Sequence, residues 1–289
     1  MLAGGLVRST ALVTVLGMSL LIWGSSLAAG CLGALTGLGG GVVIVPLLTL
    51  VFHIDIRYAV GASLLSVIAT SSGAAAAYVA EGWSNLRVGM LLEIATSIGA
   101  ITGAGLAAHL NTSVIAVVFA LVLFGSVVTS FRRHESSSDV QSDRLSRWLR
   151  LDSTYPGPSG PVRYAVTRVP AGLALMWVAG AVSGLLGIGS GALKVVAMDR
   201  VMRLPFRVST TTSNFMIGVT AATSVGIYFS RGYLDPGLAF PVVLGVLPGA
   251  LLGARVLPRA GGLFLRALFA VVVTVLAIEM AYGGLKGRI

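Results

Sequence analysis

Charged side chains are scarce in this chain: 10% of its 289 residues are Asp, Glu, Lys or Arg, whereas 56% are hydrophobic. A soluble globular domain carries about a quarter charged residues, so most of this surface must face something other than water. Apolar runs of about 20 residues are long enough to cross the hydrocarbon core of a bilayer. The composition therefore predicts an all-α, polytopic membrane protein, and a soluble alternative would need one large, fully buried helical core.

Groups that bind metals or perform covalent chemistry are also few. Cys31 is the only cysteine, which excludes an intrachain disulfide and a cysteine zinc site. The three histidines, His53, His109 and His134, are dispersed and show no metal-ligand spacing. The sequence contains no carboxylate cluster and no Gly-x-Ser-x-Gly motif. We therefore expect no enzyme activity, no metal site and no cofactor.

Basic residues outnumber acidic residues by 20 to 10, and lysine occurs only at Lys194 and Lys286. Arginine collects in the cytoplasmic loops of membrane proteins, so nucleic acid is not an expected partner. The long polar segment 132–164 is rich in arginine and contains a Pro156-Gly157-Pro158 turn. We interpret it as a cytoplasmic linker that is partly helical around Leu145 to Leu149.

The two halves of the chain match each other when one is shifted by 150 residues without a gap. The matched positions include three glycines, an arginine, a serine and a tyrosine: Gly37/Gly187, Gly39/Gly189, Gly41/Gly191, Arg57/Arg207, Ser63/Ser213 and Tyr78/Tyr228. Internal repeats of this size build many secondary transporters. We therefore predict two pseudosymmetric transmembrane repeats, at 1–131 and 165–289, separated by the linker at 132–164.

Each half contains five apolar segments, of which the second is too short to span a bilayer comfortably. The segments are 10–35, 40–52, 57–80, 87–108 and 112–131, then 165–185, 190–202, 207–229, 237–256 and 263–282. The short ones follow glycine-rich stretches and indicate broken or re-entrant helices, which gives about 8–10 membrane segments. Loop charges orient the halves oppositely, which predicts an inverted repeat. The first segment is expected to stay as a helix rather than be cleaved as a signal peptide, since its counterpart recurs in mid-chain.

Glycine-rich breaks are the sharpest local feature. Gly39, Gly40 and Gly41 in the first half correspond to Gly189, Ser190 and Gly191 in the second. Glycine permits unusual backbone conformations, and non-helical backbone survives in a membrane only when it is buried in protein or lines a wet cavity. The N–H groups of the helix that restarts after each break favour an anion. These residues are candidates for substrate binding, and close helix packing is the alternative.

Hydroxyl and amide side chains form a run from Ser209 to Asn214 at the start of an apolar segment. Such groups can replace the hydration of an oxyanion without burying a fixed charge. Further candidates for substrate binding are therefore Ser63, Thr211, Thr212, Ser213 and Asn214. The alternative is that these side chains bond to their own helix or hold helices together.

Ionisable residues inside membrane segments are candidates for function. Lys194 follows the second glycine break and could neutralise a bound anion, or snorkel to the interface. Glu93 lies within its segment and is the candidate for proton coupling. Arg57 and Arg207 begin equivalent segments, where they could attract anions or act as interfacial anchors.

The motif Gly37-Leu38-Gly39-Gly40-Gly41 with Pro46 behind it, followed by Ala59-Val60-Gly61-Ala62-Ser63, resembles the first motif of the TauE/SafE sulfite exporter family. The second-half glycines and the Ser209–Asn214 run occupy the family's repeated positions. The resemblance covers about Leu27 to Tyr282. This chain departs from the family pattern in its second half. Val196 stands at the position that matches Pro46, where a second proline is expected, and Lys194 lies close to it. The resemblance implies an inner-membrane permease for sulfite, organosulfonates or related sulfur compounds, often an exporter.

Together, these patterns predict a secondary transporter that moves a small sulfur-containing anion across the cytoplasmic membrane. Its expected partners are the anion, the lipid bilayer and a coupling proton or ion. The alternatives are a transporter for another small solute or a cation, and a non-transporting membrane scaffold.

Overall fold

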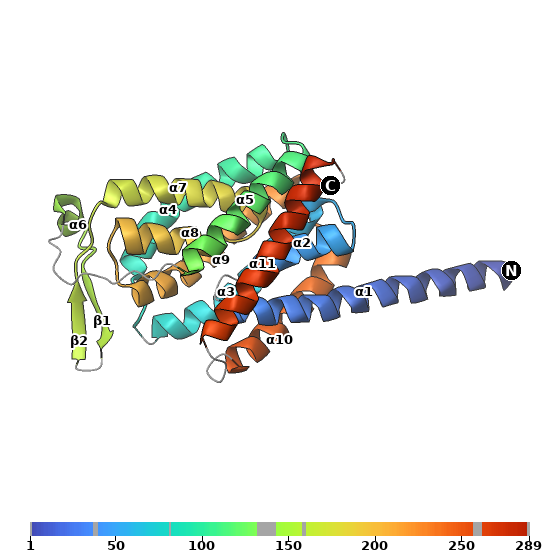
Figure 1. Ribbon diagram of the computed structural model, residues 1–289, viewed down its shortest axis with the longest axis horizontal. Coiled ribbons are helices and arrows are strands. Elements are labelled where there is room, and N and C mark those ends of the chain that lie inside the picture. The colour runs from blue at the N-terminus through green and yellow to red at the C-terminus, as the bar shows by residue number, and fades with distance from the viewer. Residues whose placement is uncertain are drawn as a thin grey trace.

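The computed structural model describes residues 2–36, 40–80, 82–131, 143–157, 160–256 and 262–287. In this part of the chain the fold is built almost entirely from helices (Figure 1). The first half contains α1 (Leu2–Thr36), α2 (Gly41–Pro46), η1 (Leu47–Val51), α3 (Ile56–Ala80), α4 (Leu86–Ala107) and α5 (Thr112–Phe131). The second half contains α7 (Val169–Leu186), α8 (Gly191–Val196), η2 (Ala197–Val201), α9 (Phe206–Ser230), α10 (Pro236–Val256) and α11 (Gly262–Leu285).

Every predicted apolar segment is a helix, with bounds that differ from the expected ones mostly at the ends. The two short segments each consist of an α-helix followed by a π-helix, so η1 and η2 complete the runs that α2 and α8 begin. The bounds of α2, η1 and α3 lie 150 residues before those of α8, η2 and α9. The inverted orientation of the halves in a bilayer stays a prediction.

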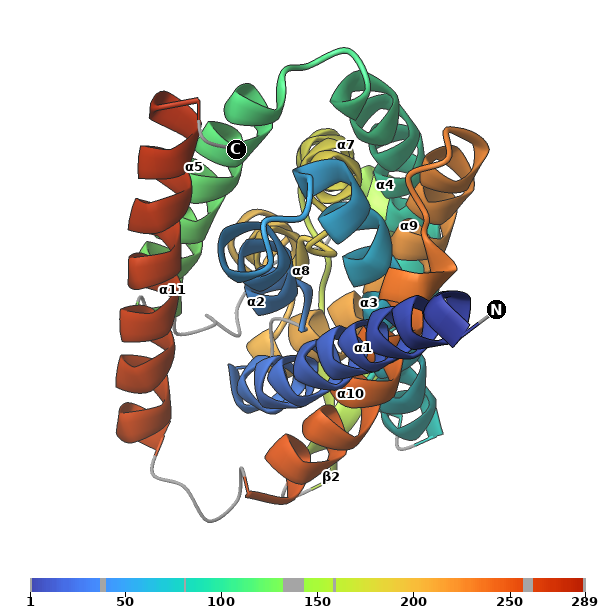
Figure 2. The same cartoon turned by 90° about the vertical axis from the view of Figure 1, so that its right-hand side faces the viewer.

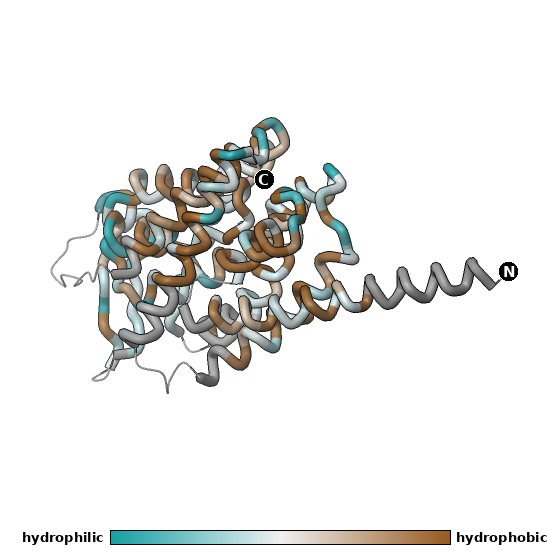
Figure 3. The backbone as a smooth tube through the Cα atoms, turned by 45° about the vertical axis from the view of Figure 1, so that its right-hand side comes forward, coloured by the Kyte–Doolittle hydropathy of each residue, from teal (hydrophilic) through white to brown (hydrophobic). Residues whose placement is uncertain are grey.

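Three helices in the described part of the chain are long and apolar enough to cross a membrane: they include Leu16–Gly33 of α1, Leu86–Ala107 and Val169–Leu186. Shorter apolar helices cover Gly41–Val51, Thr112–Val127, Pro236–Leu252 and Ala270–Leu285. Figure 3 shows hydrophobic residues along the helices and hydrophilic residues mainly at the turns that join them. This pattern is that of a polytopic α-helical membrane protein.

The long helices pack in pairs, and each pair joins a helix of the first half to a helix of the second half. Helix α1 lies along α10 and α4 lies along α7, while α3 packs on α9 and α5 on α11. Figure 2 shows the short helices α2 and α8 near the centre of this arrangement. The short helices that follow the two glycine-rich breaks are therefore surrounded by helices from both halves.

Glycines allow two of these pairs to approach closely. A Cβ on Gly99 would lie 2.1 Å from the Trp177 carbonyl oxygen, and one on Gly103 would lie 1.9 Å from that of Ala181, so α4 and α7 pack backbone against backbone. At the equivalent place in the other pair, a Cβ on Gly249 of α10 would lie 2.1 Å from the Leu27 carbonyl oxygen of α1. Such small-residue contacts are how helices associate closely in lipid.

The linker contains more structure than the sequence predicts. The short helix α6 (Arg144–Trp148) lies where partial helix is expected, but β1 (Ser153–Gly157) and β2 (Gly160–Tyr164) form an antiparallel hairpin that was not predicted. The hairpin holds the turn before α4, because Asn85 Nδ2 donates to the Leu151 carbonyl at 2.9 Å and to the Tyr164 hydroxyl at 2.7 Å. Burial raises the pKa of Tyr164, so its phenol stays neutral.

Candidate functional site

The break in the second half has a left-handed backbone. Helix α7 ends where the Gly187 N–H donates to the Ser183 carbonyl at 2.8 Å, and φ is +69° at Gly187, +71° at Gly189 and +46° at Ser190. Glycine adopts such angles without strain, whereas a serine there is uncommon. Helix α8 then begins at Gly191, and its first N–H groups have no acceptor within the helix.

The break in the first half lies against the second. A Cβ on Gly41 would lie 2.7 Å from Ser63 Oγ and 2.9 Å from the Gly187 carbonyl oxygen. Ser63 is fully buried on α3 and donates to that same carbonyl at 2.8 Å. Gly40 accepts from the Ile44 N–H at 3.0 Å and so begins α2. The candidate Gly39 lies outside the described residues.

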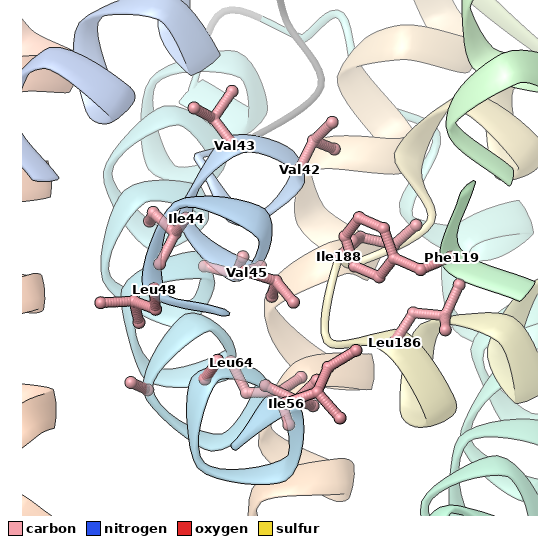
Figure 4. Close-up of a cluster of buried hydrophobic side chains, with 14 of the residues drawn as sticks. Val42, Val43, Ile44, Val45, Leu48, Ile56, Leu64, Phe119, Leu186 and Ile188 are labelled. Carbon is pink, nitrogen blue, oxygen red and sulfur yellow. The ribbon is translucent and has the colours of Figure 1, made fainter. Parts of the chain in front are cut away.

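Apolar side chains lie beside the described residues of the two breaks. Figure 4 shows Val42, Val43, Ile44 and Val45 of α2 on one side, with Ile188 of the second break and Phe119 of α5 on the other. All six are buried. Polar groups in these surroundings need a partner, because an unsatisfied buried hydroxyl costs about 1–3 kcal/mol.

Ser190 lacks such a partner. Its side chain is 4% exposed, and its Oγ makes no hydrogen bond to any of the residues that the structure describes. Ser213 of α9, by contrast, donates to the Gly191 carbonyl at 3.3 Å. Ser190 therefore offers an unused hydroxyl donor at the start of α8.

Lys194, one turn further along α8, is fully buried and belongs to a polar cluster with Thr220 and Glu93. Lys194 Nζ donates to Thr220 Oγ1, and Thr220 Oγ1 lies 2.6 Å from Glu93 Oε1 on α4. Ser97 donates to the same carboxylate oxygen at 3.2 Å. Glu93 is 7% exposed, and its Oε2 has no hydrogen-bond partner among the described residues. Thr220 therefore joins Lys194, which is predicted to neutralise an anion, to Glu93, which is predicted to couple a proton.

The hydroxyl run at the start of α9 divides between two roles. Thr211 donates to the Trp83 carbonyl at 3.0 Å, and Thr212 accepts from the Asn85 N–H at 3.0 Å, so both hold the turn before α4. Only Ser213 reaches the break, and Asn214 is half-buried. Substrate binding by Thr211, Thr212 and Asn214 stays a prediction, and the hydroxyls of the first two are bonded to the backbone of the turn before α4.

The two arginines make reciprocal contacts between the halves. Arg57 lies 5.6 Å from the centroid of the Tyr233 ring, and Arg207 lies 5.4 Å from that of Trp83, which is the position 150 residues before Tyr233. Arg57 Nη2 also donates to the Leu110 carbonyl at 2.8 Å, beyond the end of α4. Both contacts suit residues that anchor the ends of helices.

Sequence reasoning missed Thr220 and Ser97. Each is a hydroxyl inside an apolar segment, a setting in which back-bonding to the helix is the usual role. Thr220 Oγ1 indeed lies within hydrogen-bonding distance of the Met216 carbonyl oxygen, at 2.9 Å, as an alternative acceptor to Glu93. A usable signal was that Thr220 falls on Thr70 at the 150-residue offset.

Comparisons with known proteins agree on one family. The sequence profile described as Sulfite exporter TauE/SafE matches residues 22–280. The probable membrane transporter protein YunE of Bacillus subtilis is 27% identical over 267 residues, which is 90% of this chain and 96% of that protein. The probable membrane transporter protein YdhB of the same organism is 28% identical over 223 residues, 76% of this chain and 82% of that protein. No solved structure matches the chain significantly.

The matched region runs from α1 to α11 and contains both breaks and the polar cluster of Glu93, Lys194 and Thr220. The similarity also extends over nearly the full length of a relative that is described as a transporter. The chain therefore belongs to the TauE/SafE sulfite exporter family and is a multi-pass membrane transporter.

Proposed function

We propose that this protein is a secondary transporter that exports sulfite, an organosulfonate or a related small sulfur-containing anion across the cytoplasmic membrane. The observation that carries the proposal is the buried, unpartnered hydroxyl of Ser190, which lies one turn before the fully buried Lys194. A hydroxyl donor and an ammonium group together suit an oxyanion. The family description supports the same substrate class.

In this proposal the anion lies where the two breaks meet. Ser190 Oγ donates to an anion oxygen, the first N–H groups of α8 donate to others, and the positive charge of Lys194 offsets the anion's charge. Opposed rocking of the two halves around this point would open it to each side of the membrane in turn.

A cation is less well supported at the same place. A cation would need free carbonyl oxygens, but the Gly187 carbonyl accepts from Ser63 and the Gly191 carbonyl accepts from Ser213. Two carbonyls of the break are thus occupied, whereas the Ser190 donor is unused. This contrast favours an anion over a cation.

The test is thermal unfolding of the detergent-purified protein with sulfite, methanesulfonate, taurine, sulfate or chloride at matched ionic strength. A ligand that binds only the folded state stabilises it by about 2.7 kcal/mol at one hundred times its Kd. We expect a selective upward shift in Tm with a sulfur oxyanion. In Ser190→Ala we expect the free energy of unfolding without ligand to equal that of wild type or to rise by up to about 1–3 kcal/mol, because the buried hydroxyl has no partner among the described residues. The affinity should fall about 10- to 100-fold, the loss of one hydrogen bond to a charged group.

Ser63→Ala is the matched control, because its hydroxyl is engaged with the Gly187 carbonyl. It should lower the ligand-free stability by about 1 kcal/mol and change the anion affinity less than Ser190→Ala does. Equal shifts in wild type and Ser190→Ala would reject Ser190 as an anion donor. No shift with any anion would reject the proposed sulfur-anion site and favour a transporter of another solute.

A further inference from the structure

The polar cluster occupies only one of two equivalent places in the fold. At the 150-residue offset, Lys194, Thr220 and Glu93 correspond to Ile44, Thr70 and Val243. Ile44 is fully buried, as Lys194 is. Among the described residues, Thr70 bonds to carbonyls of its own helix, those of Ser66 at 3.0 Å and Val67 at 3.2 Å. At the corresponding sequence positions, apolar residues therefore stand in place of the two charges.

Burying two charges is unfavourable unless they are well compensated, and apolar residues of similar volume often serve stability as well or better. At the corresponding positions, the chain itself carries the apolar residues Ile44 and Val243. Helix packing alone therefore does not explain why charged residues stand at positions 194 and 93. A lysine and a glutamate joined through a hydroxyl suggest instead that a proton is exchanged there.

Few other ionisable groups lie on the elements around the pair. Helices α5 and α7, which pack against α8 and α4, carry none. Helix α9 carries Arg207 at its start, beside Trp83, and Tyr228 near its end, where its hydroxyl bonds to the Gly184 and Leu185 carbonyls. The π-helix η2 carries Asp199, which is buried, and Arg200, while Arg87 lies at the start of α4 and donates to the Arg150 carbonyl. The charge nearest to Glu93 in its hydrogen-bonded cluster is that of Lys194.

We propose that Glu93, Thr220 and Lys194 form a proton-binding site that couples proton binding to anion binding at Ser190, an inference that rests on the proposed function. With Glu93 ionised, its charge and that of Lys194 cancel, and the break offers no net positive charge. With Glu93 protonated, the ammonium of Lys194, a residue one turn after Ser190 in the sequence of α8, is left without its counter-charge. The anion then replaces that counter-charge, so proton and anion bind together.

Thr220 can adapt to both states without losing a hydrogen bond. In the ionised state its hydroxyl donates to Glu93 Oε1 and accepts from Lys194 Nζ. When Glu93 carries a proton, the carboxyl donates to Thr220 Oγ1, and the threonine proton turns to the Met216 carbonyl, which lies 2.9 Å away. The cluster thereby gains one proton, and the Thr220 hydroxyl keeps a hydrogen-bond partner for both its donor and its acceptor.

Because coupling is reciprocal, anion binding must draw a proton onto the protein. Isothermal titration calorimetry of the wild-type protein with methanesulfonate, and separately with sulfite, in two buffers of different ionisation heat measures this uptake. Methanesulfonate keeps its charge near neutral pH, so it reports the protein's own proton. We expect uptake of about one proton per anion, and an affinity that falls about tenfold per pH unit once Glu93 ionises.

Variants separate coupling from binding. Glu93→Gln should bind the anion with the affinity of the protonated wild type, with no proton uptake and no pH dependence. Thr220→Val should weaken the pH dependence, whereas Thr70→Val, the same change at the equivalent position, should leave it as in wild type. Anion binding without proton uptake in wild type would overturn the proton site and leave the anion site standing. Absence of anion binding in wild type would overturn both.

Discussion

Lys194→Met is expected to destabilise the protein by about 3–5 kcal/mol at neutral pH, because removing one partner leaves the other charge buried without compensation. Lys194 is fully buried, and Glu93 is 7% exposed, so water cannot replace the lost ammonium. Thermal unfolding in detergent, followed by tryptophan fluorescence, measures the change.

The double variant Glu93→Val/Lys194→Ile should recover that stability to within about 1 kcal/mol of wild type or exceed it. It copies Val243 and Ile44, the residues at the equivalent place in the other half. The variant should nevertheless fail to transport, since both the proton site and the positive charge are gone. A double variant less stable than Lys194→Met alone would show that the pair serves the fold rather than transport.

Gly103→Ala is expected to lower the free energy of unfolding by about 3 kcal/mol or to prevent folding. The added Cβ would lie 1.9 Å from the Ala181 carbonyl oxygen, so α4 and α7 must move apart. Alanine favours the helix over glycine by about 1 kcal/mol, so the propensity change acts in the opposite direction.

Gly105→Ala makes the same change two residues further along α4, where the new Cβ meets nothing within 4 Å. It should be neutral or stabilise the protein by up to about 1 kcal/mol. The comparison is made by thermal unfolding of the two variants beside wild type. Equal effects of the two substitutions would mean that the α4–α7 contact does not determine stability.

Much of the helical order follows from the sequence, because apolar segment length and glycine position are local signals. The predicted segment 207–229 is α9 (Phe206–Ser230), and the predicted 112–131 is α5 with the same bounds. The short segments beside the breaks were also recognisable, since a run of about a dozen residues is too short to cross a bilayer.

The β-hairpin of the linker could not be predicted in the same way. Ser153–Gly157 and Gly160–Tyr164 lack alternating hydrophobicity, and four of the five residues of β2 are exposed. The hairpin is held instead by contacts with distant residues, such as that of Asn85 with Tyr164 of β2. Strands of this kind depend on tertiary context more than on propensity.

The sequence predicts several residues of the candidate site but not the contacts between them. Lys194 and Glu93 stand out because charges in membrane segments are rare, yet no sequence signal joins residues 101 positions apart. The hydroxyl run drew attention to Thr211 and Thr212, whose hydroxyls hold the turn at Trp83 and Asn85. The single hydroxyl of Thr220, which bridges the two charges, is marked in the sequence only by its match with Thr70 at the 150-residue offset.

The central claim is that this chain carries a sulfur oxyanion across a membrane, and flux of sulfite in proteoliposomes tests it most directly. Wild-type protein should give saturable sulfite flux above that of protein-free vesicles, and Glu93→Val/Lys194→Ile, folded as judged by its unfolding transition, should give none. Sulfite flux equal to that of protein-free vesicles, from wild-type protein that is folded and reconstituted, would contradict the account.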